Sequence, residues 1–284
     1  MQNVEIPGGA FRRFNPWPFA VLIFLTAAAV LYLVPVYVLL TTSLKSMAEV
    51  SRTSVWAIPR RPTLEAFREA GRALAPGLKN SVLLTVPATI ISSFLGSLNG
   101  FALAKLRFKG ADLVFAIFLF GMFLPYQVVL IPLVQLLMRY RLYGNILGLI
   151  VTHVVYGLPI TTLMFRNYYT AVPGELLEAA RIDGAGLVTF YRRILLPLSV
   201  PGFLVAVIWQ FTNIWNDFLF AVTITNDPRS QPVTVALQGL AGSLVARWHV
   251  QMAGALLAAL PTLVVYIFLG RYFIRGLLSG SLKG

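Results

Sequence analysis

The amino-acid sequence predicts an all-α integral membrane protein with six transmembrane helices. The chain is 58% hydrophobic and only 12% charged, whereas a soluble domain of 284 residues would expose far more charge. It also contains six runs of 23 residues or more without Asp, Glu, Lys or Arg. No alternating pattern of about ten residues indicates a barrel strand, so helices are the spanning form we expect.

Each uncharged run is long enough for a helix of about 20 residues to cross about 30 Å of hydrocarbon. The first run follows Arg12 and Arg13, but it is too long for the apolar region of a signal peptide, so we expect it to remain as a first span. We expect the fifth span to be shifted to about 200–222. The runs occupy residues 14–44, 80–104, 113–138, 142–165, 194–216 and 248–270.

The predicted organisation divides the chain into five parts. A short amphipathic helix is also expected near 64–73, between the first two spans. The parts are an N-terminal segment (1–15), a first transmembrane helix (16–42), a segment outside the membrane (43–77), a core of five helices with a polar loop at about 167–199 (78–272), and a C-terminal tail (273–284).

Charge and composition also limit the partners. The formal net charge is +13, and the basic residues lie between apolar runs, which favours anionic lipid headgroups and docking proteins over nucleic acid. The chain has no cysteine, which excludes disulfides and thiolate metal sites. His153 and His249 are far apart in sequence and do not indicate a metal site.

The polar loop predicts a short helix, a small-residue turn and a second short helix. Pro173 suits the first turn of the first helix, and Leu176, Ala179 and Ala180 form a small apolar face suited to docking in a groove. Residues 184–186, Gly-Ala-Gly, end this helix, and a second helix is expected over about 187–196, stopping at Pro197. A simple connecting loop is an equal alternative on spacing alone.

The same loop resembles the EAA loop of ABC-importer permease subunits. The matching residues are Glu178-Ala179-Ala180, Asp183-Gly184-Ala185, Ile194 and Leu196-Pro197. In that family the loop is a coupling helix that docks in a cleft of the ATPase subunit. The residues that the resemblance implies for ATPase coupling are Glu175, Glu178, Ala179, Ala180, Asp183, Gly184, Ala185 and Gly186.

Two further segments resemble carbohydrate-type members of that family. The turn at 100–110 is similar to the one that follows their second span, and 270–284 is similar to the C-terminal signature of the maltose-type second permease subunit. In the family this tail enters the ATPase dimer interface, which implies contacts from Ser279, Gly280 and Lys283. The string at 215–220 and the loop at about 223–250 are closest to glucose- or mannose-type members.

The fifth span carries the most polar side chains. Gln210, Asn213 and Asp217 share one face at i, i+3 and i+7, and an acid at membrane depth indicates function. Amides and a carboxylate between aromatic rings suit a polyol, although bonds to a neighbouring helix or subunit are an equal alternative. The candidates for the translocation path are Trp209, Gln210, Asn213, Asn216 and Asp217.

The resemblance implies a type I ABC importer permease fold with both termini cytoplasmic, in the cell inner membrane. With the N-terminus inside, twelve Lys and Arg lie on the inside and eleven on the outside, a difference too small for the positive-inside rule to decide the orientation. The orientation is therefore taken from the EAA loop, which must face the cytoplasmic ATPase. No G-x-x-x-x-G-K-[ST] occurs, so the chain is not expected to be an enzyme or to hold a cofactor, and ATP and Mg would bind a partner. The implied partners are a second permease subunit, two ATPase subunits, an external sugar-binding protein and the lipid bilayer.

Other classes of protein remain as alternatives. An ion-coupled secondary transporter would more often show buried acids in several spans, and here Asp217 is the one candidate. An ABC permease for a non-sugar solute would share every motif above. A membrane enzyme would need converging catalytic groups, for which His153 and Tyr156 are the best pair, and a packed core histidine is the simpler interpretation.

Overall fold

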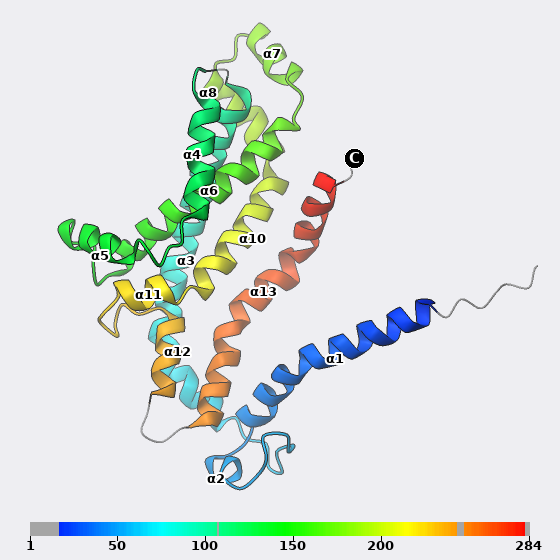
Figure 1. Cartoon of the computed structure of the whole chain (residues 1–284), viewed down its shortest axis with the longest axis vertical. Coiled ribbons are helices and arrows are strands. Elements are labelled where there is room, and N and C mark those ends of the chain that lie inside the picture. The colour runs from blue at the N-terminus through cyan, green and yellow to red at the C-terminus, as the bar shows by residue number, and fades with distance from the viewer. Residues whose placement is uncertain (1–16, 107, 243–246, 282–284) are drawn as a thin grey trace, which may run out of the picture.

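The computed structural model describes residues 17–106, 108–242 and 247–281, the last ten of them by backbone alone. All regular structure in this part of the chain is helical (Figure 1). The elements are α1 (Trp17–Ser43), α2 (Met47–Val50), α3 (Glu65–Lys105), α4 (Ala111–Phe123), α5 (Leu130–Arg139), α6 (Ile146–Thr170), α7 (Glu175–Ile182), α8 (Leu187–Phe190), the π-helical segment η1 (Tyr191–Leu195), α9 (Leu196–Leu198), α10 (Val200–Asn216), α11 (Leu219–Ile224), α12 (Val233–Ala241) and α13 (Trp248–Ser281).

Four helices in the described residues are long and apolar enough to cross a membrane, namely α1, α3, α6 and α13. A fifth candidate is the bent pair Leu187–Leu198 and Val200–Asn216, whose halves meet at 74°. The surface of α1 is exposed along nearly its whole length, as a helix in contact with lipid would be. The chain is therefore an all-helical membrane protein with four or five candidate spans.

The second span is longer than the sequence predicted. The expected amphipathic helix near 64–73 and the expected span at 80–104 are one helix, α3, of 41 residues. At 1.5 Å per residue such a helix is about 60 Å long, roughly twice the hydrocarbon thickness. A helix of this length extends beyond the bilayer, and its N-terminal part lies beside α12 and the start of α13 (Figure 1).

The third uncharged run is not a single helix. It folds as α4 and α5, separated by Leu124 in an extended conformation (φ −70°, ψ 120°). Leu124 precedes Pro125, and the proline ring disfavours the helical conformation in the residue before it. The expectation of one continuous helix over 113–138 is therefore wrong.

The fifth span also differs from the expectation. α10 begins at Val200 as predicted, but it ends at Asn216 instead of continuing to about 222. Asp217 is extended (φ −65°, ψ 131°), and its side chain accepts from the backbone N–H groups that open α11. This side chain replaces the next helical hydrogen bonds, so the helix breaks at Asp217.

Small residues let α3 and α6 approach closely, and on α3 they are Ser92, Gly96 and Gly100, spaced four residues apart. A Cβ added to Gly96 would lie 2.8 Å from the carbonyl carbon of Thr161, and one on Gly100 would lie 2.6 Å from Phe165 Cβ. Ser92, Gly96 and Gly100 meet Gly157, Thr161 and Phe165 in the same order, so the two helices run parallel. The segment 106–145, which holds α4 and α5, must therefore return the chain from one end of this pair to the other.

Gly96→Ala is predicted to destabilise the chain, because the added methyl group forces α3 and α6 apart. We expect a loss of about 1–3 kcal/mol, measured as a lower midpoint of thermal unfolding in detergent. The matched control is Gly121→Ala in α4, where no atom lies within 4 Å of the added methyl group. Equal midpoints for the two variants would contradict the close approach.

Candidate functional site

A cavity of about 650 Å³ lies beside the break between α10 and α11. Its walls come from α6, α10, α11 and the link between α4 and α5. All five predicted translocation-path residues line it, and so do several residues that the sequence did not single out as path residues. The predicted ones are Trp209, Gln210, Asn213, Asn216 and Asp217, and the others include Tyr126, His153, Tyr156, Phe218 and Phe220.

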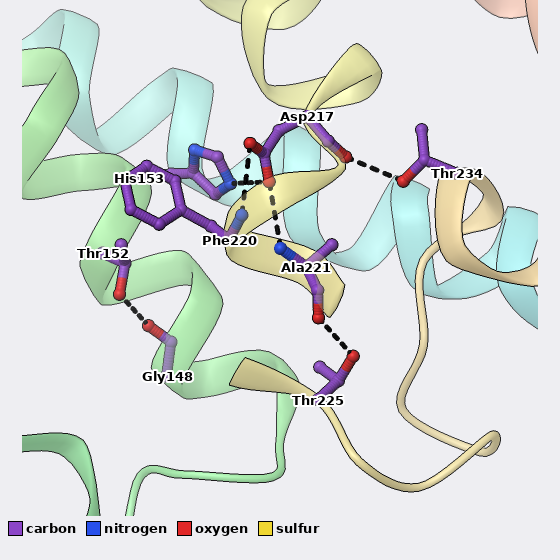
Figure 2. A network of polar contacts seen from close by, with 8 residues as sticks. All are labelled: Gly148, Thr152, His153, Asp217, Phe220, Ala221, Thr225 and Thr234. Carbon is purple, nitrogen blue, oxygen red and sulfur yellow. Dashed lines mark hydrogen bonds and ion pairs between the residues drawn. The ribbon is translucent and has the colours of Figure 1, made fainter. Parts of the chain in front are cut away.

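Asp217 holds the helix break in place (Figure 2). Its carboxylate accepts from the N–H groups of Phe220 at 3.4 Å and Ala221 at 3.1 Å, and so caps the N-terminus of α11. Its backbone carbonyl accepts from Thr234 Oγ1 of α12 at 2.7 Å. One residue thus connects α10, α11 and α12 at the edge of the cavity.

His153 of α6 approaches the same carboxylate. Its Nε2 lies 3.6 Å from Asp217 Oδ2, and its ring packs edge-on against Phe220 at 5.5 Å between centroids (Figure 2). The side chains of His153 and Asp217 are 8% and 14% exposed, so this contact is largely shielded from solvent. The two side chains are in contact without a hydrogen bond, because 3.6 Å is too long for one, and a sequence spacing of 64 residues does not reveal this contact.

The amides of the cavity wall divide into two kinds. Gln210 is buried, and its Nε2 donates to Ser92 Oγ of α3 at 2.9 Å. For this residue the structure therefore shows a bond to a neighbouring helix, the alternative to a role in lining the path. Asn213 and Asn216 are exposed, and each donates its side-chain N–H to the carbonyl four residues earlier in α10. Their amide oxygens accept no hydrogen bond from the described residues, so they are available to a ligand.

The cavity wall combines these oxygens with aromatic faces. Trp209 is 40% exposed and Tyr126 is 40% exposed. Among the described residues, no Lys or Arg lines the cavity, and the one carboxylate there, Asp217, already accepts two N–H groups. Such a wall suits an uncharged polar molecule with hydroxyl groups and apolar faces.

The predicted helix-turn-helix lies at one end of the molecule, and α2 lies at the other (Figure 1). α7 ends in a Schellman motif, in which Ala185 N–H bonds to Ala180 O at 2.8 Å and Gly184 N–H bonds to Arg181 O at 3.0 Å. Gly184 has φ +77°, a left-handed conformation that favours glycine. The predicted turn is confirmed, with a physical reason for its glycine.

Two details of this loop differ from the prediction. Pro173 lies before α7, with Gly174 as the N-cap, instead of in the first helical turn. Of the predicted docking face, Leu176 and Ala179 are exposed, whereas Ala180 is buried and packs with Leu177 into the core beneath the loop. The difference from the prediction is therefore confined to Ala180.

The second helix of the loop is continuous from Leu187 to Leu198, one residue past Pro197, and contains the π-helical segment η1. The loop tip exposes large apolar side chains, Ile182 (87%) and Val188 (71%) above all. Acidic Glu175, Glu178 and Asp183 are also exposed. The implied coupling residues therefore surround an apolar tip, with Ala180 turned inward.

The implied tail contacts are only partly described. Ser279 and Gly280 belong to the last turns of α13, so this part of the tail continues the last span as a helix. Lys283 lies outside the described residues.

These features define a membrane transport protein, in which a polar cavity adjoins a broken span and a polar helix-turn-helix lies at one end. Comparison with known proteins identifies its family. The chain matches the family of binding-protein-dependent transport system inner membrane components over residues 98–279. The chain belongs to this family: it is the permease component of a binding-protein-dependent ABC importer, a non-catalytic inner-membrane subunit that works with an ATPase and a binding protein.

Individual relatives agree with this assignment. A probable ABC transporter permease protein of Pyrococcus horikoshii is 49% identical over 96% of this chain and 100% of its own. A xylose/arabinose import permease protein of Haloferax volcanii is 35% identical over 87% of each chain. A glucose import system permease protein of Saccharolobus solfataricus is 30% identical over 92% of this chain and 94% of its own.

One solved structure shows the same fold. A chain of a bacterial ABC transporter involved in the import of the acidic polysaccharide alginate superposes with a TM-score of 0.83. The alignment covers 93% of this chain and 99% of that chain at 20% sequence identity.

Single cysteines are predicted to distinguish the cavity from the lipid-facing surface, because the natural chain has no cysteine. Asn213→Cys should react with a charged thiol reagent in open membranes, since a cavity of this polarity admits water. Leu263→Cys, 53% exposed on α13, should react far more slowly, because a thiolate does not form in hydrocarbon. Labelling is measured as a mass shift, and equal rates at the two positions would contradict an aqueous cavity.

Proposed function

We propose that the chain is one of two permease subunits of an ATP-driven sugar importer and forms half of its translocation pathway. The named sugar permeases among the relatives support the substrate class. The cavity supports it independently, since exposed amide oxygens and aromatic rings suit the hydroxyl groups and apolar faces of a mono- or oligosaccharide. A glucose- or mannose-type substrate remains the narrower prediction.

The proposed topology has six crossings and both termini in the cytoplasm. The parallel pair α3 and α6 supports it, because two parallel spans require the chain between them to cross back. α4 and α5 would together make that return. The other crossings are α1, α3, α6, the bent helix that ends with α10, and α13.

The observation that carries the coupling role is the exposed apolar tip of the loop around α7. A side chain such as Ile182, 87% exposed at the end of a polar loop, is the kind of residue that a partner's groove buries. The loop would dock in the ATPase, which would hold ATP and Mg, while the C-terminal tail with Ser279, Gly280 and Lys283 would make a second contact. An external sugar-binding protein would deliver the substrate.

Reconstitution tests this function against ion-coupled transport. The tagged chain is purified from detergent-solubilised native membranes, and its partners are identified by mass spectrometry. The complex is then placed in proteoliposomes with its binding protein and tested for ATP-dependent uptake of radiolabelled xylose, arabinose or glucose. Uptake by the chain alone, without ATP or partners, would contradict the proposal, and uptake of amino acids but no sugar would reject the substrate class.

Gly184→Val is predicted to uncouple transport while leaving membrane insertion intact. Valine in the left-handed conformation costs about 1–2 kcal/mol, so the Schellman turn opens and α7 is displaced. ATP-dependent uptake and co-purification of the ATPase should both fall several-fold.

The matched control for this turn is Gly174→Val. Gly174 lies before α7 in a right-handed conformation (φ −67°, ψ −30°), and an added Cβ on either glycine has no atom within 4 Å beyond the chain neighbours. The control should therefore retain its turn and its uptake. Normal uptake by Gly184→Val would contradict the coupling role of the turn.

A further inference from the structure

Four buried hydroxyl groups meet where the loop joins the spans, and we call them the hydroxyl cluster (Ser97, Tyr169, Tyr191 and Ser199). Ser97 Oγ lies 2.6 Å from Tyr169 Oη and 2.8 Å from Tyr191 Oη. Ser199 Oγ lies 3.0 Å from Tyr169 Oη. None of the four residues is more than 5% exposed, so their hydroxyls find hydrogen bonds within the protein: they bond to one another, and Ser199 Oγ also bonds to Leu195 O at 2.5 Å.

The members of the cluster come from four places that transport would move relative to one another. Ser97 lies on α3, and Tyr169 lies in the last turn of α6. Tyr191 opens the π-helical segment η1, and Ser199 is the single residue between the two helices that meet at 74°. The cluster thus connects two spans to the interior of the second loop helix, at Tyr191, and to the residue after its end, Ser199.

The π-helical segment marks this helix as unusual. Its hydrogen bond runs from Leu196 N–H to Tyr191 O, five residues apart, so one extra residue is inserted into the turn. Such insertions are rare and are frequently found at functional sites. Here the extra residue lies next to the tyrosine that reaches Ser97.

The first loop helix reaches the cluster through packed side chains. Leu177 and Ala180 of α7 belong to the same apolar core as Tyr169 and Tyr191. Phe101 of α3 also packs there, with its ring 5.4 Å from that of Tyr191. A displacement of α7 therefore acts on the hydroxyl cluster through close contacts, and interiors this dense transmit strain.

Hydroxyl groups give this junction a property that apolar side chains lack. Apolar surfaces can slide past one another by small steps, whereas a buried hydroxyl is either bonded or left unsatisfied at a cost of about 1–3 kcal/mol. The four residues therefore hold α3, α6 and the loop in discrete arrangements. This is the behaviour required where a docked loop must move spans.

We propose that the hydroxyl cluster is the joint that transmits movement of the loop to α3 and α6. Its four members are positioning residues for ATP-driven transport, because they touch neither the substrate nor ATP. The inference rests on the proposed function, since it takes the loop around α7 to be the ATPase contact.

The test measures sugar imported per ATP hydrolysed by the complete transporter in proteoliposomes, with radiolabelled xylose, arabinose or glucose. Tyr191→Phe removes one hydroxyl and keeps its ring, and should lower this ratio roughly fivefold, equivalent to about 1 kcal/mol for one hydrogen bond. Tyr169→Phe removes a hydroxyl that contacts both Ser97 and Ser199, so it should lower the ratio of sugar to ATP further. Co-purification of the ATPase should not change, because the loop tip is untouched.

The matched control is Tyr37→Phe, which also removes one tyrosine hydroxyl bond, to Trp56 O at 2.8 Å, at the other end of the molecule. This variant should keep the wild-type ratio. An unchanged ratio in Tyr169→Phe, even with a lower unfolding midpoint, would overturn the proposal and assign the cluster a purely structural role. An equal fall in Tyr37→Phe would overturn it as well.

Ser199→Ala provides a second variant with little change in volume, should the tyrosine variants fail to assemble. It should lower the ratio, and the double variant with Tyr169→Phe should lose less than the product of the two single losses, because the two hydroxyls share one contact. A wild-type ratio in Ser199→Ala would overturn the proposal that the cluster transmits movement. A wild-type transporter without any ATP-dependent uptake would instead overturn the proposed function.

Discussion

The close parallel contact between α3 and α6 is the constraint on which the rest of this permease depends. Lipid supplies no hydrophobic force between helices, so their association depends on van der Waals contact and hydrogen bonds. Gly96 and Gly100 provide the first, and the bond from Thr161 Oγ1 to Ser92 O at 3.0 Å provides the second. Ser92 also accepts from Gln210, which attaches α10 to the same pair.

This arrangement places the cavity and the loop on the same helices. One apolar core lies beneath the loop and includes Phe101, Phe165 and Tyr191, and a second lies near the helix break and includes Leu149, Phe220 and Ile224. α10 runs from the bend at Ser199, beside the first core, to the break at Asp217, beside the cavity. A rotation of α10 at the bend would therefore change the cavity wall, which is the geometry that alternating access requires.

Much of this architecture follows from the sequence, because it depends on local composition and spacing. Long uncharged runs predict spans, and a glycine after a short helix predicts the left-handed turn at Gly184. The polar face of α10 and its cavity residues follow from helical periodicity. The break between α4 and α5 had a local signal in Pro125, which a count of uncharged residues does not capture.

Other features depend on tertiary contacts and could not be predicted in this way. Asp217 ends α10 because its carboxylate finds the N–H groups of α11, and no pattern distinguishes that outcome from a continuous helix. Ala180 packs inward with Leu177 although the sequence placed it on the docking face with Leu176 and Ala179, because helical spacing alone does not show which residues meet the core. The hydroxyl cluster joins residues up to 102 positions apart, so only the folded chain reveals it.

Site-specific cross-linking tests the central claim, that the loop around α7 is the contact with the ATPase. Because the chain has no cysteine, a single Ile182→Cys carries the only thiol of this chain, to which a short bifunctional reagent attaches in native membranes. The account predicts a cross-linked product between Ile182→Cys and an ATPase polypeptide, and none from Trp56→Cys, which is 58% exposed near α2. A product from Trp56→Cys alone, or from neither position, would contradict it.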